Sequence, residues 1–251
     1  MAGSVSCPAS PTIDHGCARF GARIYLLRPS MSFRLPPSVY HCMVEGRSIF
    51  LDLARDRYFA LPADLEAAFR QAVESPCDSA IAPDEVERLI RAGVLEAADE
   101  GQMPAHPTPI VAPAADRVSV AYPSKASLML MVLVVLAQLL ASLMVRIVPM
   151  RVIARHLERL NSGEGHDDDV MATDRLAAAF RRASVFIRVE GNCLPRTLAF
   201  VWLARHRRCN ANLVIGVRIN PFSAHCWAQA GNVVLNDRLE RANLFKPILH
   251  I

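Results

Sequence analysis

The chain has 251 residues, a formal net charge of +4, and seven cysteines. This length suits one large domain or two modest ones. The charge is too small to indicate nucleic-acid binding by itself, and we expect none. The cysteines are odd in number and form no CxxC pair, which argues against both a zinc ribbon and a disulfide framework. Reduced thiols in the cytoplasm are the simplest interpretation.

Residues 1–30 look unlike the rest of the chain. They contain Pro8, Pro11 and Gly16 without sustained periodicity, and they lack the compact apolar core of a signal peptide. Met31 then opens a segment that reads like a natural protein start. We therefore interpret residues 1–30 as a disordered extension or a mis-assigned start.

Three short alternating runs follow, at Val39–Met43, Ser48–Asp52 and Tyr58–Leu61. Glu45-Gly46 between the first two is a tight-turn signal, so these runs predict a small sheet. Helical spacing of apolar residues follows over 63–73, and a second helix is expected from Pro83, with a glycine placed to end it. Residues 31–100 are thus expected to form a small winged-helix-like module.

Residues 101–123 contain five prolines, which is the composition of a linker, and we place the domain boundary there. The second domain would then cover residues 124–251. It opens with an uncharged run over 126–145 that is long enough to span a membrane. A helix buried inside a domain is the alternative, because such a helix can be apolar all round.

The rest of the second domain is predicted to run helix, helix, strand, strand, strand. The last two strands are joined around Gly231. The five segments are residues 171–187, 192–208, 211–219, 225–230 and 232–237. An α+β fold is therefore expected.

Three side chains in these elements suit nucleophilic catalysis. Cys193 stands at the start of the second helix, where unpaired N–H groups and the helix dipole favour a thiolate. His225 begins one strand and Asp237 ends the next, so a tight turn would bring them side by side. The carboxylate could then orient the imidazole through Nδ1–H.

Each of these residues also has a plainer interpretation. Cys193 could be a buried structural cysteine, and His225 a core histidine bonded to the backbone. Asp237 could cap a local turn, with Asn236 as its rival for orienting the histidine. A metal site formed by the histidine and Cys226 with Cys193 would have unsuitable spacing for zinc, so we predict no metal and no cofactor.

The motifs "CLPRTLAFVWLARHR", "LVIGVR", "PFSAHCWAQ", "VVLND" and "FKPI" occur in this order. Over roughly residues 125–251 they resemble the transglutaminase-like branch of papain-type cysteine peptidases. Within it they are similar to the leader peptidases, or B proteins, of lasso-peptide gene clusters. Cys226 departs from that family, which often has a small residue there. Residues 31–100 resemble the PqqD-like precursor-recognition module fused to many B proteins.

The resemblance implies a function and its partners. The first module would capture the leader of a ribosomally made precursor, and the Cys193–His225–Asp237 triad would remove that leader. The core would then pass to an ATP-dependent, asparagine-synthetase-like cyclase. The same triad would also allow acyl transfer to an amine. Leader binding by strand addition near the third strand and second helix is expected to use Arg57, Tyr58, Phe59, Leu61, Val86 and Ile90.

The long apolar helix leaves a rival open, in which the protein is a non-catalytic adaptor that holds the peptide at the membrane for an exporter. We expect the helix not to span a bilayer. Gln138 near its middle would be costly there. A spanning helix would also separate the two domains that one precursor must visit. We expect it instead to be buried against a helix at Ala177–Val185 and the peptidase strands, in a cytoplasmic protein with peripheral membrane association as an open alternative.

Overall fold

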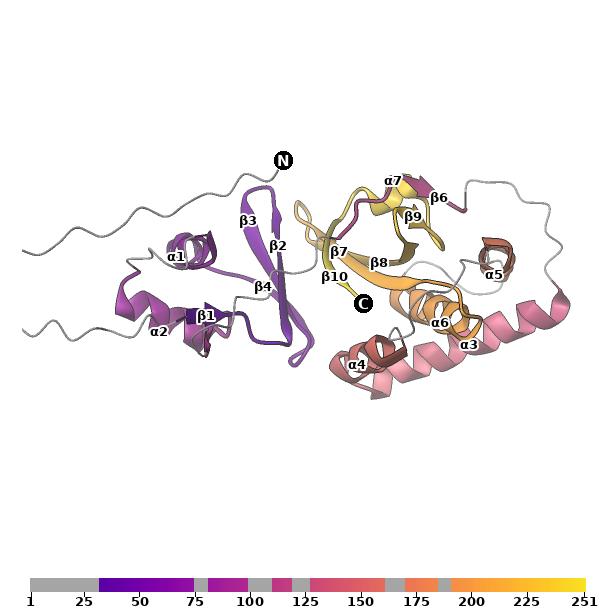
Figure 1. The fold of residues 1–251 in the computed structure, drawn as a ribbon, viewed down its shortest axis with the longest axis horizontal. Coiled ribbons are helices and arrows are strands. Elements are labelled where there is room, and N and C mark those ends of the chain that lie inside the picture. The colour runs from indigo at the N-terminus through magenta and orange to yellow at the C-terminus, as the bar shows by residue number, and fades with distance from the viewer. Residues whose placement is uncertain (1–31, 75–80, 99–109, 119–126, 161–169, 185–190) are drawn as a thin grey trace, which may run out of the picture. The chain divides into compact units, whose positions relative to one another are not determined.

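The structure is a computed structural model that describes residues 32–74, 81–98, 110–118, 127–160, 170–184 and 191–251 (Figure 1). Residues 31–251 form one compact unit. Residues 1–30, which were interpreted as a disordered extension or a mis-assigned start, lie outside the described residues. So does most of the proline-rich segment at 101–123.

The first strands form the predicted antiparallel sheet, in the order β2-β3-β4. Their bounds are β2 Val39–Val44, β3 Arg47–Asp52 and β4 Arg57–Ala60, within two residues of the prediction. Glu45 and Gly46 join β2 to β3 with φ angles of 47° and 78°, as a tight hairpin turn requires. β2 and β4 are the two edges of this sheet.

Two helices and a second, smaller sheet complete this region. α1 is Ala63–Glu74 and α2 is Pro83–Ala92, which ends at Gly93 in the left-handed conformation with φ 76°. The sequence did not predict β1 (Ser32–Arg34) or β5 (Glu96–Ala98), which pair antiparallel. The core of this region is aromatic: the rings of Phe50 and Phe69 meet edge to face at 4.9 Å.

The later strands form a five-stranded sheet in the order β10-β7-β8-β9-β6. Their bounds are β6 Ala115–Asp116, β7 Asn212–Arg218, β8 Ser223–Ala230, β9 Val233–Val234 and β10 Lys246–His250. β6 pairs parallel with β9, so residues 115–116 of the segment predicted as a linker are part of this sheet. β10 was not predicted as a strand, although its "FKPI" motif was noticed.

Five helices accompany this sheet. They are α3 Leu128–Ile147, α4 Met150–Leu160, α5 Val170–Ala183, α6 Cys193–His206 and the short α7 Leu239–Ala242. α6 packs against β7 and β8, and α3 runs along α6 and also contacts α5 (Figure 1). α6 therefore lies between the sheet and α3.

The burial expected for the long apolar helix is only partly found. α3 does contact α5, but its buried side chains are small or polar: Val134, Ala137, Gln138 and Ala141. Ten of its large side chains are exposed by 38% to 83%, and we call them the outer face of α3: Leu128, Met129, Val132, Leu133, Leu136, Leu139, Leu140, Leu143, Met144 and Ile147. Leu130, Val135 and Val145 are partly buried and pack against the core. The expectation of complete burial is wrong, because α6 offers α3 room for one face only. By length and composition α3 could cross a membrane.

Candidate active site

Cys193 is the first residue of α6, as the sequence predicted. Gly191, with φ 76°, turns the chain into the helix. Pro195 in the first turn is tolerated because the N–H groups there have no acceptor within the helix. The backbone N–H groups of Cys193 and Leu194 belong to this first turn, so they have no acceptor within the helix. The thiol therefore stands beside donors that can stabilise an anion.

His225 lies in β8 and is 5% exposed, and it contacts the carboxylate of Asp237, which follows β9. The ring nitrogen that meets Asp237 Oδ2 is Nε2, and not Nδ1 as the sequence analysis assumed. Asp237 Oδ1 accepts a hydrogen bond of 2.8 Å from the N–H of Arg238, which fixes the carboxylate. With Nε2 occupied, Nδ1 is the nitrogen left to serve the thiol.

Hydrogen bonds set the charge state of these three groups. A hydrogen bond from the Cys226 thiol, the hydrogen bond and charge of His225, and the Cys226 backbone N–H together outweigh burial and lower the pKa of Cys193 to about 4. Burial alone would lower the pKa of His225, but its bonds to Asp237 and Cys193 raise it. Burial likewise opposes the lowered pKa of Asp237, which the bond from His225 maintains. Both shifts favour the ion pair of a Cys193 thiolate and a His225 imidazolium over the neutral pair.

Cys226 has a role that the sequence analysis did not assign. Its side chain is buried, and its bond to Cys193, with burial second, raises the pKa of the Cys226 thiol well above its ordinary value. It thus stays a neutral donor beside the Cys193 thiolate. The residue that departs from the family pattern supports the nucleophile. Its position directly after the histidine was the only signal in the sequence.

Asn236, the rival for orienting the histidine, makes its hydrogen bonds to other groups. Its side-chain oxygen accepts a hydrogen bond of 2.8 Å from the Ala228 N–H, and its amide nitrogen donates to Thr197 Oγ1 at 3.0 Å. Thr197 in turn donates to the Cys226 carbonyl at 3.2 Å. These bonds tie α6 to β8, so they hold the helix that carries Cys193 at a fixed distance from the strand that carries His225.

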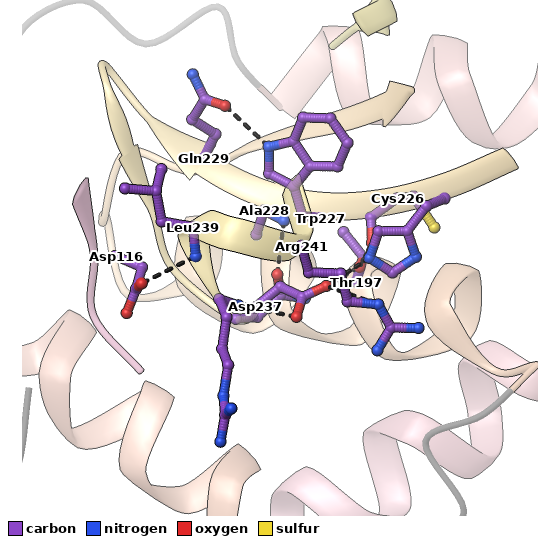
Figure 2. A network of polar contacts seen from close by, with 12 residues as sticks. Asp116, Thr197, Cys226, Trp227, Ala228, Gln229, Asp237, Leu239 and Arg241 are labelled. Atoms are coloured by element: carbon purple, nitrogen blue, oxygen red, sulfur yellow. Dashed lines mark hydrogen bonds and ion pairs between the residues drawn. The ribbon is translucent and has the colours of Figure 1, made fainter. Parts of the chain in front are cut away.

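Gly216 on β7 lies directly opposite His225 in the register. A Cβ there would come within 2.8 Å of Phe245 Cβ and 2.9 Å of the Trp227 ring. Trp227 is fully buried, as expected for a core residue, and its indole N–H donates to Gln229 at 2.9 Å (Figure 2). The glycine therefore lets the core close against the strand that carries the histidine.

The three residues open into one cleft with a volume of about 1110 Å³. Its lining is rich in arginine: Arg181, Arg196, Arg238 and Arg241 surround the triad, with Glu240 on the same rim. The sequence analysis named none of these four arginines as a site residue. Among the described residues no cluster of three or more histidine, cysteine or acidic side chains could hold a metal ion.

The predicted leader-binding residues lie in the first region, and none of them lines this cleft, although the Tyr58 ring contacts Phe222 with centroids 5.5 Å apart. Phe59 is half-buried and stacks on Phe50, and Arg57 lies over the Phe59 ring at 5.1 Å. Tyr58 and Val86 are half-buried, and Ile90 is 44% exposed. Leu61 is only 3% exposed, so its inclusion is corrected: its side chain packs in the core with Leu65 and Phe69 and offers little surface to a peptide.

Comparisons with known proteins agree with this geometry. Residues 135–250 match the model of the transglutaminase-like superfamily. This part of the chain is a transglutaminase-like domain. A stretch of 48 residues is 40% identical to the microcin J25-processing protein McjB of Escherichia coli; it covers 19% of this chain and 23% of that protein. No solved structure gave a significant match.

Proposed function

We propose that this protein is a cysteine peptidase that removes the leader from a ribosomally made lasso-peptide precursor. The observation that carries the proposal is the continuous chain of hydrogen bonds from Cys193 through His225 to Asp237. The transglutaminase-like domain suggests a cysteine hydrolase, and the similarity to a microcin-processing protein suggests this kind of substrate.

In the proposed mechanism the Cys193 thiolate attacks the scissile carbonyl carbon. The N–H groups at the start of α6 stabilise the oxyanion that forms. The His225 imidazolium gives its proton to the leaving amine, and a thioester to Cys193 remains. His225 then takes a proton from water, which attacks the thioester and releases the acid. Asp237 keeps the imidazole in place during both steps. Transfer to an amine in place of water would use the same residues.

We propose that residues 31–100 capture the leader as an added strand. β4 is an edge of its sheet in the described residues, so its outer backbone groups can pair with an extended peptide. Arg57, Tyr58 and Phe59 lie on β4, and α2 carries Val86 and Ile90, which are not buried. The freed core amine would then pass to an asparagine-synthetase-like, ATP-dependent cyclase.

We propose a cytoplasmic location with α3 lying on the membrane surface, and not across the bilayer. The outer face of α3 is apolar, and exposed arginines stand in its last turn at position 146 and on α4 at positions 151, 155 and 159, as in helices that lie in an anionic interface. The opposite face is occupied by contacts with α5 and α6. Gln138 is buried there, and its amide donates to the Val134 carbonyl at 3.4 Å.

Alkaline carbonate extraction of a membrane fraction tests this location. A surface-bound protein is released into the supernatant. A protein that stays in the pellet spans the bilayer, and that result would contradict both the location and the simple cytoplasmic route for the precursor.

The peptidase proposal is tested against the rival adaptor by measuring two properties of the same purified variants. Cleavage of the precursor is followed by mass spectrometry, and leader affinity by titration. Cys193→Ala and His225→Ala should lose cleavage by at least about 10⁴-fold and keep leader affinity. An adaptor would be indifferent to both substitutions. Cleavage by Cys193→Ala at the wild-type rate would overturn the mechanism.

A further inference from the structure

The cleft around the triad carries more positive than negative side chains. Four arginines line it, against the carboxylates of Asp237 and Glu240. Asp237 is already engaged by His225, by the Arg238 N–H and, at 4.0 Å, by Arg241. The excess of positive charge therefore faces the place where a substrate must lie.

Arg196 differs from the other three arginines. Arg181 donates to the Val118 carbonyl at 2.8 Å, Arg241 pairs with Asp237, and Arg238 is exposed to water. Arg196 is half-buried, and its guanidinium lies over the Phe180 ring at 5.8 Å. Among the described residues, no hydrogen bond or ion pair to this guanidinium is found.

The position of Arg196 relates it to the nucleophile. It follows Cys193 by three residues, so the two side chains share one face of α6. Burial lowers the pKa of Arg196 and the charge of Asp237 raises it, but an arginine remains a cation at any pH of interest. A partly desolvated cation with five N–H donors and only an aromatic ring against it retains most of its capacity to bind an anion.

We propose that Arg196 forms a subsite for a carboxylate of the substrate, so that the peptide cut here carries an aspartate, a glutamate or a free carboxyl terminus close to the scissile bond. This inference rests on the proposed peptidase function and names the class of peptide that the site selects. A planar guanidinium can hold a carboxylate through two parallel N–H···O bonds. The subsite would therefore position the substrate peptide as well as attract it. A neutral residue such as glutamine in place of Arg196 would lose both effects.

The test uses two small alkylating reagents that differ in charge. Iodoacetate carries a carboxylate and iodoacetamide is its neutral counterpart, and both alkylate a thiolate. Their rates at Cys193 are measured at pH 7 by mass spectrometry of the peptide that contains it, which separates it from the other cysteines. The ratio of the two rates cancels any change in the amount of thiolate.

Arg196→Gln should lower the iodoacetate rate by about tenfold and change the iodoacetamide rate by less than about twofold, as expected for one nearby charge in a partly buried site. Arg196→Lys keeps the charge, and should retain most of the preference for iodoacetate. Arg151→Gln, an exposed arginine on α4 outside the cleft, is the control for net charge and should leave the ratio unchanged. Circular dichroism of each variant shows whether it is folded.

Two results would overturn the subsite. In the first, the ratio of the two rates in Arg196→Gln equals that of the wild type; if both reagents slow equally, Arg196 acts on the thiolate and not on the carboxylate. In the second, Arg151→Gln changes the ratio as much as Arg196→Gln, so that net charge and not position is responsible. Both leave the peptidase proposal standing. A wild-type Cys193 that reacts with neither reagent would remove the nucleophile, and with it the subsite defined relative to that nucleophile.

Discussion

α3 and α6 pack against each other, yet α6 buries most of its large apolar side chains and α3 exposes most of its own. α6 carries the nucleophile and is enclosed by the sheet and by α3, with Phe200, Val201 and Ala204 fully buried. α3 has the more apolar sequence, but it buries Ala137, Gln138 and Ala141 and exposes its leucines and methionines. An apolar sequence therefore does not by itself tell which helix is enclosed.

The difference follows from what each helix does. The nucleophile must keep its position relative to His225, so α6 is held by packing and by the Thr197 and Asn236 hydrogen bonds. α3 presents small residues to α6, which allows a close approach. The large side chains of its outer face remain exposed, and an exposed apolar face of this extent marks a site of interaction with a membrane or another protein. α6 thus holds the nucleophile in position, and α3 offers a surface for contact.

The comparison predicts that a charge lowers the stability of the protein much more on the buried face of α3 than on its outer face. Ala137→Glu would bury an unpaired carboxylate against α6 and should destabilise the protein by about 3 to 5 kcal/mol. The neighbouring Leu136→Glu lies on the outer face and should change stability by less than about 1 kcal/mol. Urea denaturation of the purified variants measures both. Equal losses would show that the outer face is not exposed in solution.

Removing the carboxylate of Asp237 tests how much the activity of Cys193 on α6 depends on the residues that the sheet contributes. Asp237→Ala should reduce the rate of peptide cleavage by about 10²- to 10³-fold, less than the loss of Cys193, because the thiolate and its helix remain. The turnover rate at saturating peptide is the measurement. Asp237→Asn serves as the control of similar shape. A wild-type rate for Asp237→Ala would remove Asp237 from the triad.

The thiolate at the start of α6 should show itself in a pH profile. The rate of Cys193 alkylation is expected to stay high on acidification until the pH nears the lowered pKa of Cys193, about 4, where the thiolate takes up a proton. In Cys226→Ala the largest cause of that lowering is gone, so the inflection should move to higher pH. Cys209→Ala, a buried cysteine outside the site, should leave it in place. No movement in Cys226→Ala would mean that its thiol does not support the anion.

Local patterns in the sequence were enough to predict β2, β3 and α6, because a tight turn and helical spacing act over a few residues. The three triad residues could be named for the same reason: each stands at an end of a predicted element, although His225 lies inside β8 and Asp237 follows β9. β6 could not be predicted, since its pairing with β9 joins residues more than 100 positions apart, Ala115 with Val233. Nor could the outward orientation of α3, which depends on how much room the neighbouring helices leave.

The chemical role of Cys193 is tested most directly by trapping the thioester. The purified protein is mixed with its precursor peptide, quenched in acid within the first turnover and digested, and the peptide that contains Cys193 is weighed by mass spectrometry. The account predicts an added mass equal to the leader minus one water on Cys193, which disappears on longer incubation as free leader accumulates. Leader released without this adduct at any time, or an adduct found on Cys226 instead, would contradict it.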